Sequence, residues 1–217
     1  ERDSAYNAEI NSASGYPYGF GPTSQNVIIP AFLAAYSGTN PDKITLNPFK
    51  LFPLPNWQFT YTGLSDMPFF KKYFKKLTVS NTYRGTMSIN SFSTNLLYKD
   101  ASGANTQEFT RETDLKGNFI SKYEITQITI SEQFSPLVKF DMNWINNILS
   151  SIEFKKDRSL SLNLTNSQLT ESKGYEVVLG TGYRFKEVMI PIKIGGTKKE
   201  LKSDLNIKLD FSMKSNR

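Results

Sequence analysis

Leu77-Thr78-Val79-Ser80-Asn81-Thr82-Tyr83-Arg84-Gly85-Thr86-Met87-Ser88-Ile89 is the stretch that decides the fold. Its even positions are all polar, whereas its odd positions are mostly apolar. Successive side chains of a β-strand point to opposite sides, so this alternation predicts a strand with one polar and one apolar face. The run is also much longer than the about five or six residues of a typical strand in a soluble protein.

The same alternation returns along the rest of the chain. Tyr123 to Ile130 is a less regular strand, and we expect at least seven strands in all. Together they predict an all-β fold with antiparallel strands over residues 56–217. The other alternating rows are Trp57 to Tyr61, Val138 to Trp144, Leu160 to Leu164, Tyr175 to Phe185 and Leu205 to Met213.

Residues 1–55 have a different character. Eight of the ten prolines lie between Pro17 and Pro68, together with several glycine-containing turn sequences. Proline and glycine clusters of this kind are typical of turns and irregular connections. We therefore predict an irregular connection over residues 1–55, with a short helix at 27–36.

Cysteine and histidine are both absent from the sequence. Catalysis by a thiolate or a histidine base is therefore excluded, and the commonest zinc ligands are missing. We expect no enzyme activity, no catalytic residue, no cofactor and no metal site. The net charge of +6 is spread along the chain instead of being gathered in a patch, so we expect no nucleic-acid binding.

Strand length favours a membrane wall. No apolar run approaches the roughly 18 residues that a transmembrane helix needs, whereas several rows reach the ~9 to 11 residues of a tilted transmembrane strand. Aromatic residues that could form an interfacial girdle lie toward the predicted strand ends, namely Trp57, Trp144, Tyr183, Phe185 and Phe211.

The predicted fold is therefore an antiparallel transmembrane β-barrel segment, part of a very large barrel wall, with an irregular N-terminal third. A small closed porin-like barrel and a soluble all-β binding module stay open as alternatives. If the segment is part of a transmembrane barrel, the polar residues of the alternating rows face a water-filled lumen. These lumen-facing candidates are Thr78, Ser80, Thr82, Arg84, Asp141, Asn143, Asp204, Asn206 and Lys208.

The segment from Phe69 to Leu77 has a helical period. Its apolar residues recur at i, i+1, i+4, i+5 and i+8, with four lysines on the opposite side. Pro68 suits the first turn of such a helix. A basic helix at a lipid headgroup surface and a two-turn connector at a barrel rim are both compatible with this pattern. The membrane-interface candidates are Phe69, Phe70, Lys71, Lys72, Tyr73, Phe74, Lys75 and Lys76.

A charged cluster, Lys155-Lys156-Asp157-Arg158, interrupts the apolar face between Phe154 and Leu160. A Lys or Arg on a lipid face costs roughly 2 to 4 kcal/mol at the bilayer midplane, so we expect the cluster at or beyond the interface. It is either a contact for a partner or an internally paired group of charges.

Seven strands do not close an even-numbered barrel, and an open edge in lipid leaves backbone groups without partners. The sequence begins Glu1-Arg2-Asp3, with no basic and apolar segment of a signal peptide, so we expect a secretory signal either to have been removed or to belong to a longer precursor. We therefore expect the chain to be a piece of a longer polypeptide that supplies the remaining strands.

Several ungapped phrases resemble the C-terminal barrel region of the SprA/Sov family, the outer-membrane translocons of the type IX secretion system. The resemblance runs from about Val27 to the end of the chain. The phrases are Val27 to Tyr36, Pro55 to Trp57, Ile130 to Leu137, Phe154 to Leu162, Gly182 to Phe185 and Ser203 to Asn206.

This resemblance implies a protein-conducting barrel in the outer membrane of a Gram-negative bacterium, through which folded cargo is exported. It also implies a role in the export of surface adhesins in gliding bacteria. The expected partners are the remainder of the same barrel polypeptide, a PorV-like outer-membrane barrel, a periplasmic plug protein, secreted cargo and membrane lipid. The phrases contain no catalytic motif.

Overall fold

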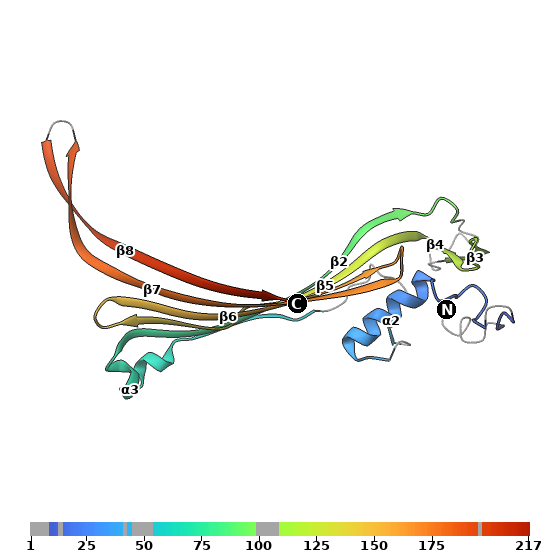
Figure 1. The fold of residues 1–217 in the computed structure, drawn as a ribbon, viewed down its shortest axis with the longest axis horizontal. Coiled ribbons are helices and arrows are strands. Elements are labelled where there is room, and N and C mark those ends of the chain that lie inside the picture. Colours follow the sequence, from blue (N-terminus) through green and yellow to red (C-terminus); the bar gives the residue numbers. More distant parts are fainter. Residues whose placement is uncertain (1–8, 13–14, 41–42, 45–53, 99–108, 195–196) are drawn as a thin grey trace. The chain divides into compact units, whose positions relative to one another are not determined.

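A computed structural model describes residues 9–12, 15–40, 43–44, 54–98, 109–194 and 197–217 (Figure 1). Strands make up most of these residues. In chain order the elements are α2 (Gln25–Ser37), β1 (Asn56–Tyr61), the 3-10 helix η2 (Gly63–Asp66), α3 (Pro68–Lys71), β2 (Phe74–Thr94), β3 (Phe109–Thr113), β4 (Phe119–Ser121), β5 (Tyr123–Trp144), β6 (Ile148–Asn163), β7 (Gln168–Ile194) and β8 (Thr197–Asn216).

The described strands form two sheets. Six of them lie in one sheet in the order β1-β2-β5-β6-β7-β8, and β3 pairs with β4 in the other. Strands β1 and β2 are antiparallel, as are β7 and β8. The prediction of an all-β, mainly antiparallel fold is therefore confirmed. Among the described residues, β1 and β8 are the two edges of the larger sheet.

The strands are longer than the sequence pattern predicted. Residues 123–130 and 138–144 were expected as separate strands, but both belong to β5, which has 22 residues and contains Pro136. Proline cannot donate a ladder hydrogen bond and usually marks an edge or a break, which is why the pattern suggested two strands. Strand β2 likewise extends beyond the alternating stretch at both ends.

The chain divides into two compact units, which are described separately. The first contains Glu1–Pro53, Met87–Ile130 and Leu160–Glu171, and the second contains Leu54–Thr86, Ser131–Ser159 and Ser172–Arg217. Strands β2, β5, β6 and β7 contribute residues to both units.

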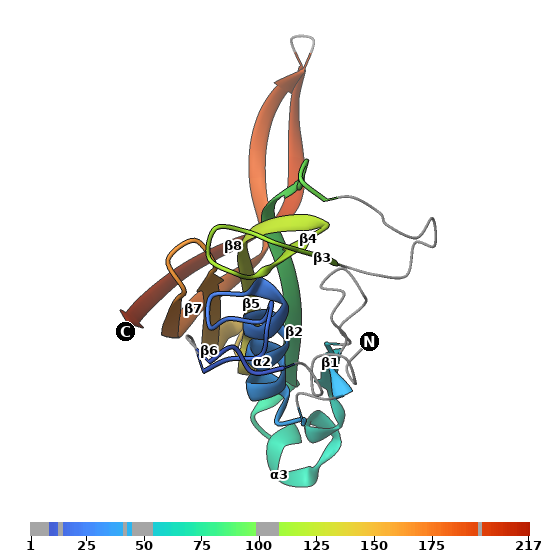
Figure 2. The same cartoon turned by 90° about the vertical axis from the view of Figure 1, so that its right-hand side faces the viewer.

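Helix α2 belongs to the first unit and lies beside its strands (Figure 2). Ile29 and Leu33 of α2 are buried, as are Ile128 and Ile130 of β5. Burial of these side chains provides the hydrophobic stabilisation of this unit.

Polar contacts fix the first turn of α2. The buried side-chain amide of Asn26 donates a hydrogen bond to Ser121 Oγ at 2.9 Å. The backbone N–H of Ile125 donates to Gln25 Oε1 at 3.2 Å. The helix ends before Gly38, which adopts a left-handed conformation at φ 65° and donates its N–H to the Ala34 carbonyl. The short helix that the sequence predicts at 27–36 lies within α2. None of the helices in the described part of the chain is long and apolar enough to cross a membrane.

In the second unit, residues 174–194 of β7 pair with residues 197–216 of β8, and the register of this ribbon separates two faces. On one face, Val177 is opposite Met213, Leu179 is opposite Phe211, and Tyr183 is opposite Ile207. On the other face, Glu176 is opposite Lys214, Val178 is opposite Ser212, Gly180 is opposite Asp210, and Arg184 is opposite Asn206. We call the first the apolar face and the second the polar face.

The helix expected from Phe69 to Leu77 is much shorter than predicted. Helix α3 is a single turn that ends at Lys71, and β2 begins at Phe74. The prediction of a basic amphipathic helix over this segment is therefore wrong. A stripe of two turns is too short to hold a helix, and pairing with the neighbouring strands takes over from Phe74 onward.

The β7–β8 ribbon continues past the turn between β5 and β6 (Figure 1). The Arg184 amide donates to the carbonyl of Asn147 in that turn at 3.0 Å, and β7 extends to Ile194. Tyr183 and Phe185 were expected near a strand end, but they lie well inside β7. Instead, they lie beside the end of the β5–β6 hairpin.

Candidate functional site: two faces of the sheet in the second unit

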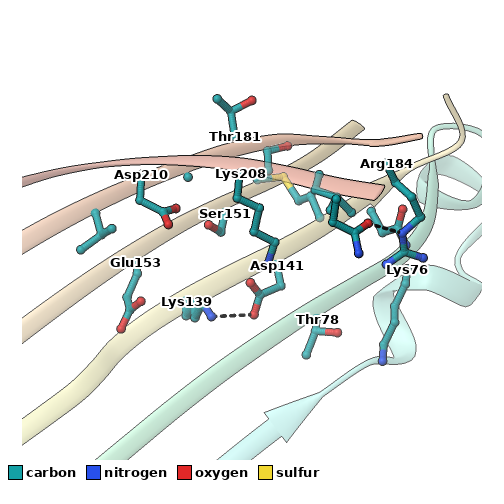
Figure 3. Close-up of a pocket in the computed structure, with 17 residues that line it drawn as sticks. Lys76, Thr78, Lys139, Asp141, Ser151, Glu153, Thr181, Arg184, Lys208 and Asp210 are labelled. Atoms are coloured by element: carbon teal, nitrogen blue, oxygen red, sulfur yellow. Dashed lines mark hydrogen bonds and ion pairs between the residues drawn. The ribbon is translucent and has the colours of Figure 1, made fainter. Parts of the chain in front are cut away.

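The polar face of the second unit contains a hollow of about 630 Å³, which we call the polar hollow (Figure 3). Strands β2, β5, β6, β7 and β8 all contribute to its lining. Its charged residues are Lys76, Lys139, Asp141, Glu153, Arg184, Lys208 and Asp210.

Cations and carboxylates are mixed in the lining of the polar hollow. Lys139 Nζ lies 3.2 Å from Asp141 Oδ2, and Arg184 Nε donates to Asn206 Oδ1 at 2.9 Å. Figure 3 shows the side chain of Lys208 extending from β8 toward Asp141 of β5. The side chains of Lys139 and Asp141 are themselves substantially exposed, at 31% and 48%, so water screens their ion pair strongly.

Glycines of β7 make room for these side chains. A Cβ at Gly182 would lie 2.5 Å from the Ile207 carbonyl oxygen and 3.1 Å from Lys208 Cγ. A Cβ at Gly174 would collide with the carboxylate of Asp157 on β6. The side chains of β6 and β8 therefore fold across β7, where no side chain opposes them.

The chemistry of the polar hollow is that of a hydrated, mixed-charge surface. Small-molecule sites are mostly apolar with a few polar groups, whereas charged and polar side chains together make up most of this lining. No group of three or more metal-ligating side chains occurs among the residues that the structure describes. The hollow can interact with water and with polar or charged surfaces that pass over it.

The apolar face is exposed. On β8, Leu205, Ile207, Leu209, Phe211 and Met213 have exposed fractions between 48% and 68%. Their partners on β7 are also exposed, with Leu179 at 44% and Tyr183 at 41%. A soluble monomer rarely exposes a contiguous apolar surface of this kind, so the face requires an apolar environment or a partner.

A hydrogen-bonded cluster interrupts the apolar face. Arg158 Nη1 of β6 lies 3.3 Å from Glu132 Oε2 of β5, and Tyr83 Oη of β2 donates to Glu132 Oε1 at 3.1 Å. The ring of Trp57 stacks on Tyr83 with centroids 4.3 Å apart, and Phe134 packs against Tyr83 at 4.7 Å. We call these five residues the Glu132 cluster.

The lumen-facing candidates occupy one side of their strands. Thr78, Asp141, Asn143, Asn206 and Lys208 come together in the lining of the polar hollow. The remaining candidates lie outside that lining: Ser80, Thr82 and Arg84 are opposite Thr60, Gln58 and Asn56 of β1, and Asp204 accepts a hydrogen bond from the Glu187 amide. Exposure of these residues to a lumen stays a prediction.

The cluster at residues 155–158 divides between the two faces. Lys155 lies 3.6 Å from Glu176 on the polar face, where Asp157 fits over Gly174. Lys156 Nζ lies 5.8 Å from the centroid of the Tyr175 ring on the apolar face, which Arg158 shares. The apolar row of β6 is therefore interrupted by two cations, because the other two residues point away from it.

The membrane-interface candidates also take several positions. Phe69 and Tyr73 are exposed and pack their rings 5.9 Å apart, and Phe74 lies 4.3 Å from Trp144 of β5. Lys75 Nζ donates to Asn147 Oδ1 at 2.7 Å, and Lys76 lines the polar hollow. The remaining candidates, Phe70, Lys71 and Lys72, lie at α3, where Phe70 packs against Phe69 and Lys72 lies over Tyr73.

Sequence reasoning missed several residues of these sites. Lys139, Arg184 and Asp210 occupy polar positions of the alternating rows, so the period-two pattern could have included them. Glu132 could not be found in this way, because its position on the apolar face contradicts the pattern.

No family model matches the chain, and no curated protein matches it.

Proposed function

We propose that the chain is a wall segment of an outer-membrane β-barrel that conducts proteins. The observation that carries this proposal is the sheet of the second unit, which exposes a continuous apolar row on one face and a charged hollow on the other. Lipid would cover the apolar face, and water would fill the space over the polar face. Alternation between lipid-facing and lumen-facing residues is the pattern of transmembrane barrels.

The edges of the sheet support a larger assembly. Strand β8 has 20 residues and is the last strand in the sheet order, so one of its backbone edges has no neighbour among the described strands. Unpaired backbone groups cost several kcal/mol each in lipid. Further strands of the same polypeptide would pair with this edge, and others would pair with β1.

The resemblance to the SprA/Sov family supports protein export as the function of this barrel. In this proposal the polar face lines a hydrated pore, and transport requires no bond chemistry in the chain. The barrel would act with a PorV-like barrel, a periplasmic plug protein and secreted cargo, in type IX secretion and in the export of gliding adhesins. It would reside in the outer membrane of a Gram-negative bacterium.

Fractionation of native cells tests the proposal. An antibody raised against this chain would be used in a denaturing immunoblot of the membrane and soluble fractions. A band far above the 24.6 kDa of the chain, in the outer-membrane fraction, is the expected result. A membrane band of the chain's own mass would indicate a small closed barrel, and a soluble band would indicate a binding module.

A further inference from the structure

We propose that Lys156 and Arg158 bind the phosphate groups of lipid headgroups, at one border of the membrane. This inference rests on the proposed function, because it requires the apolar face to be covered by lipid. It assigns a specific ligand chemistry to two cations that would otherwise be unfavourable on that face.

Both cations point to the apolar face. Lys156 lies over the ring of Tyr175, which shares a face with Val177 and Leu179. Arg158 follows two residues later on the same strand, and its partner Glu132 is bonded to Tyr83. Two independent contacts therefore place Lys156 and Arg158 on the apolar face of β6, which lipid covers in this proposal.

The Glu132 cluster has the composition of a membrane interface. Trp57 and Tyr83 combine an apolar ring with a polar group, and such side chains gather at the level of the headgroups. Trp57 Nε1 donates to Asn81 Oδ1 at 2.8 Å, so the polar edge of the indole is satisfied within the protein. Trp57 as a whole is 45% exposed, so it is accessible to lipid.

The charge at this level favours an anion. Lys156 and Arg158 contribute two positive charges, and Lys173, on the same side of β7 as Tyr175, contributes a third. Glu132 and Glu171 contribute two negative charges on this face, so one positive charge is in excess. The Arg158 side chain is 38% exposed, whereas Glu132 is 22% exposed, so the cation is the more accessible partner of the pair. A guanidinium has five N–H donors in a planar fork, which suits phosphate oxygens.

A second row of aromatic and cationic residues lies one membrane thickness away. Arg158 is ten residues from Ile148 at the other end of β6, which corresponds to roughly 33 Å along the strand. A tilt of about 40° reduces this to a height of roughly 25 Å, which is the height of the apolar band of an outer-membrane barrel. Trp144, the last residue of β5, has Phe74 against its ring, and Lys75 donates a hydrogen bond to Asn147 in the β5–β6 turn.

A fluorescence experiment tests the headgroup site. A bimane label is attached at Phe154→Cys, on the apolar face two residues before Lys156, in the membrane-reconstituted protein. The chain contains no cysteine of its own. Vesicles of phosphatidylcholine with one-fifth phosphatidylglycerol are prepared twice, with bromine carried on the acyl chains of either lipid at the same mole fraction. Bromine quenches the label only at short range, so the two preparations compare the local concentrations of the two lipids.

We expect brominated phosphatidylglycerol to be enriched near the label by about fivefold for each accessible cation. Lys156→Gln should reduce this enrichment, and it leaves the Glu132–Arg158 pair intact. The triple variant Glu132→Gln, Lys156→Gln, Arg158→Gln should abolish the enrichment without leaving an unpaired carboxylate. Lys139→Gln, on the polar face, is the matched control and should retain it.

A second label at Leu209→Cys separates this inference from the proposed function. Quenching of both labels by lipid, with no preference for phosphatidylglycerol at position 154, would overturn the headgroup site and leave the membrane wall intact. Absence of quenching at both positions would overturn both. Equal enrichment in the wild type and the triple variant would also overturn the headgroup site.

Discussion

Gly180 of β7 lies directly opposite Asp210 of β8, and the carboxylate of Asp210 occupies the space that a side chain at Gly180 would need. A Cβ at Gly180 would lie 2.5 Å from Asp210 Oδ1 and would also collide with Ser151 Oγ of β6. Three neighbouring strands therefore meet on the polar face at a position where the central strand has no side chain.

Replacement of the neighbouring Gly182 should destabilise the sheet. The side-chain oxygens of Asp210 and Ser151 can rotate away from a Cβ at Gly180, whereas a Cβ at Gly182 would lie 2.5 Å from the backbone carbonyl oxygen of Ile207. Gly182→Val should lower the free energy of unfolding by about 1 to 3 kcal/mol because it overpacks this position. Valine favours strands, so its intrinsic propensity alone predicts the opposite sign. Urea unfolding in detergent would measure the change. Thr181→Val, on the preceding residue and the opposite face, should change stability by less than about 0.5 kcal/mol, and an equal effect in both variants would contradict the packing argument.

The two faces of β8 should differ in their access to water. Cysteines introduced at Asn206, Lys208 and Asp210 should react with a membrane-impermeant maleimide, whereas cysteines at Ile207, Leu209 and Phe211 should be protected by lipid. Labelling in native membranes and after solubilisation in denaturant would be compared, with the denatured sample as the measure of full reactivity. Reaction at the odd positions with protection at the even ones would reverse the assignment of faces.

The hydrogen bond between Tyr83 and Glu132 should contribute to stability. Tyr83→Phe removes the hydroxyl that donates to the Glu132 carboxylate, and it should cost about 1 to 2 kcal/mol because the acceptor is charged and Tyr83 is only 7% exposed. Tyr61→Phe is the matched control on the edge strand β1, where the tyrosine is 41% exposed. Thermal unfolding in detergent would measure the stability of both variants. Equal destabilisation by Tyr83→Phe and Tyr61→Phe would show that the hydrogen bond from Tyr83 to Glu132 makes no particular contribution.

In the first unit, attachment of α2 should depend on Asn26. Asn26→Ala removes the amide that donates to the buried hydroxyl of Ser121 and should cost about 1 to 3 kcal/mol. Hydrogen exchange of the α2 amides would report the weaker attachment as faster exchange. Val27→Ala, at an exposed neighbouring position, should leave the exchange rates nearly unchanged. Unchanged exchange in Asn26→Ala would show that apolar burial alone holds the helix.

Period-two alternation predicted strands within each member of the six-stranded sheet and the residues that share each face, but it did not predict β3 or β4. It succeeded for β8, where Leu205 to Met213 all lie on one face, because a side-chain period of two is a direct consequence of strand geometry. It failed at Pro136, which the six-stranded sheet accommodates inside β5. The helical period of Phe69 to Leu77 was misleading from Phe74 onward, where pairing in β2 outweighed the helical stripe.

Placement of the sites depended on contacts between distant segments. Asp141 and Lys208 were each expected on a polar face, but the sequence could not show that β2, β5, β6, β7 and β8 bring them to one hollow. In the Glu132 cluster, the sequence placed Trp57 and Tyr83 in apolar rows and Arg158 as an interruption of the apolar face, but it did not identify Glu132 as their partner. Only a structure shows that Arg158, Glu132 and Tyr83 satisfy one another there.

The 20-residue edge of β8 also has a consequence for handling the protein. Outside a membrane and without a neighbouring strand, it combines unpaired backbone groups with a row of exposed apolar side chains, which together form a template for another copy of the same strand. Stacking of such strands leads to fibrils, and the lysines and aspartates of the other face are the main features that oppose it. We therefore expect the chain to precipitate on dilution out of detergent, and to do so faster at high salt, where these charges are screened.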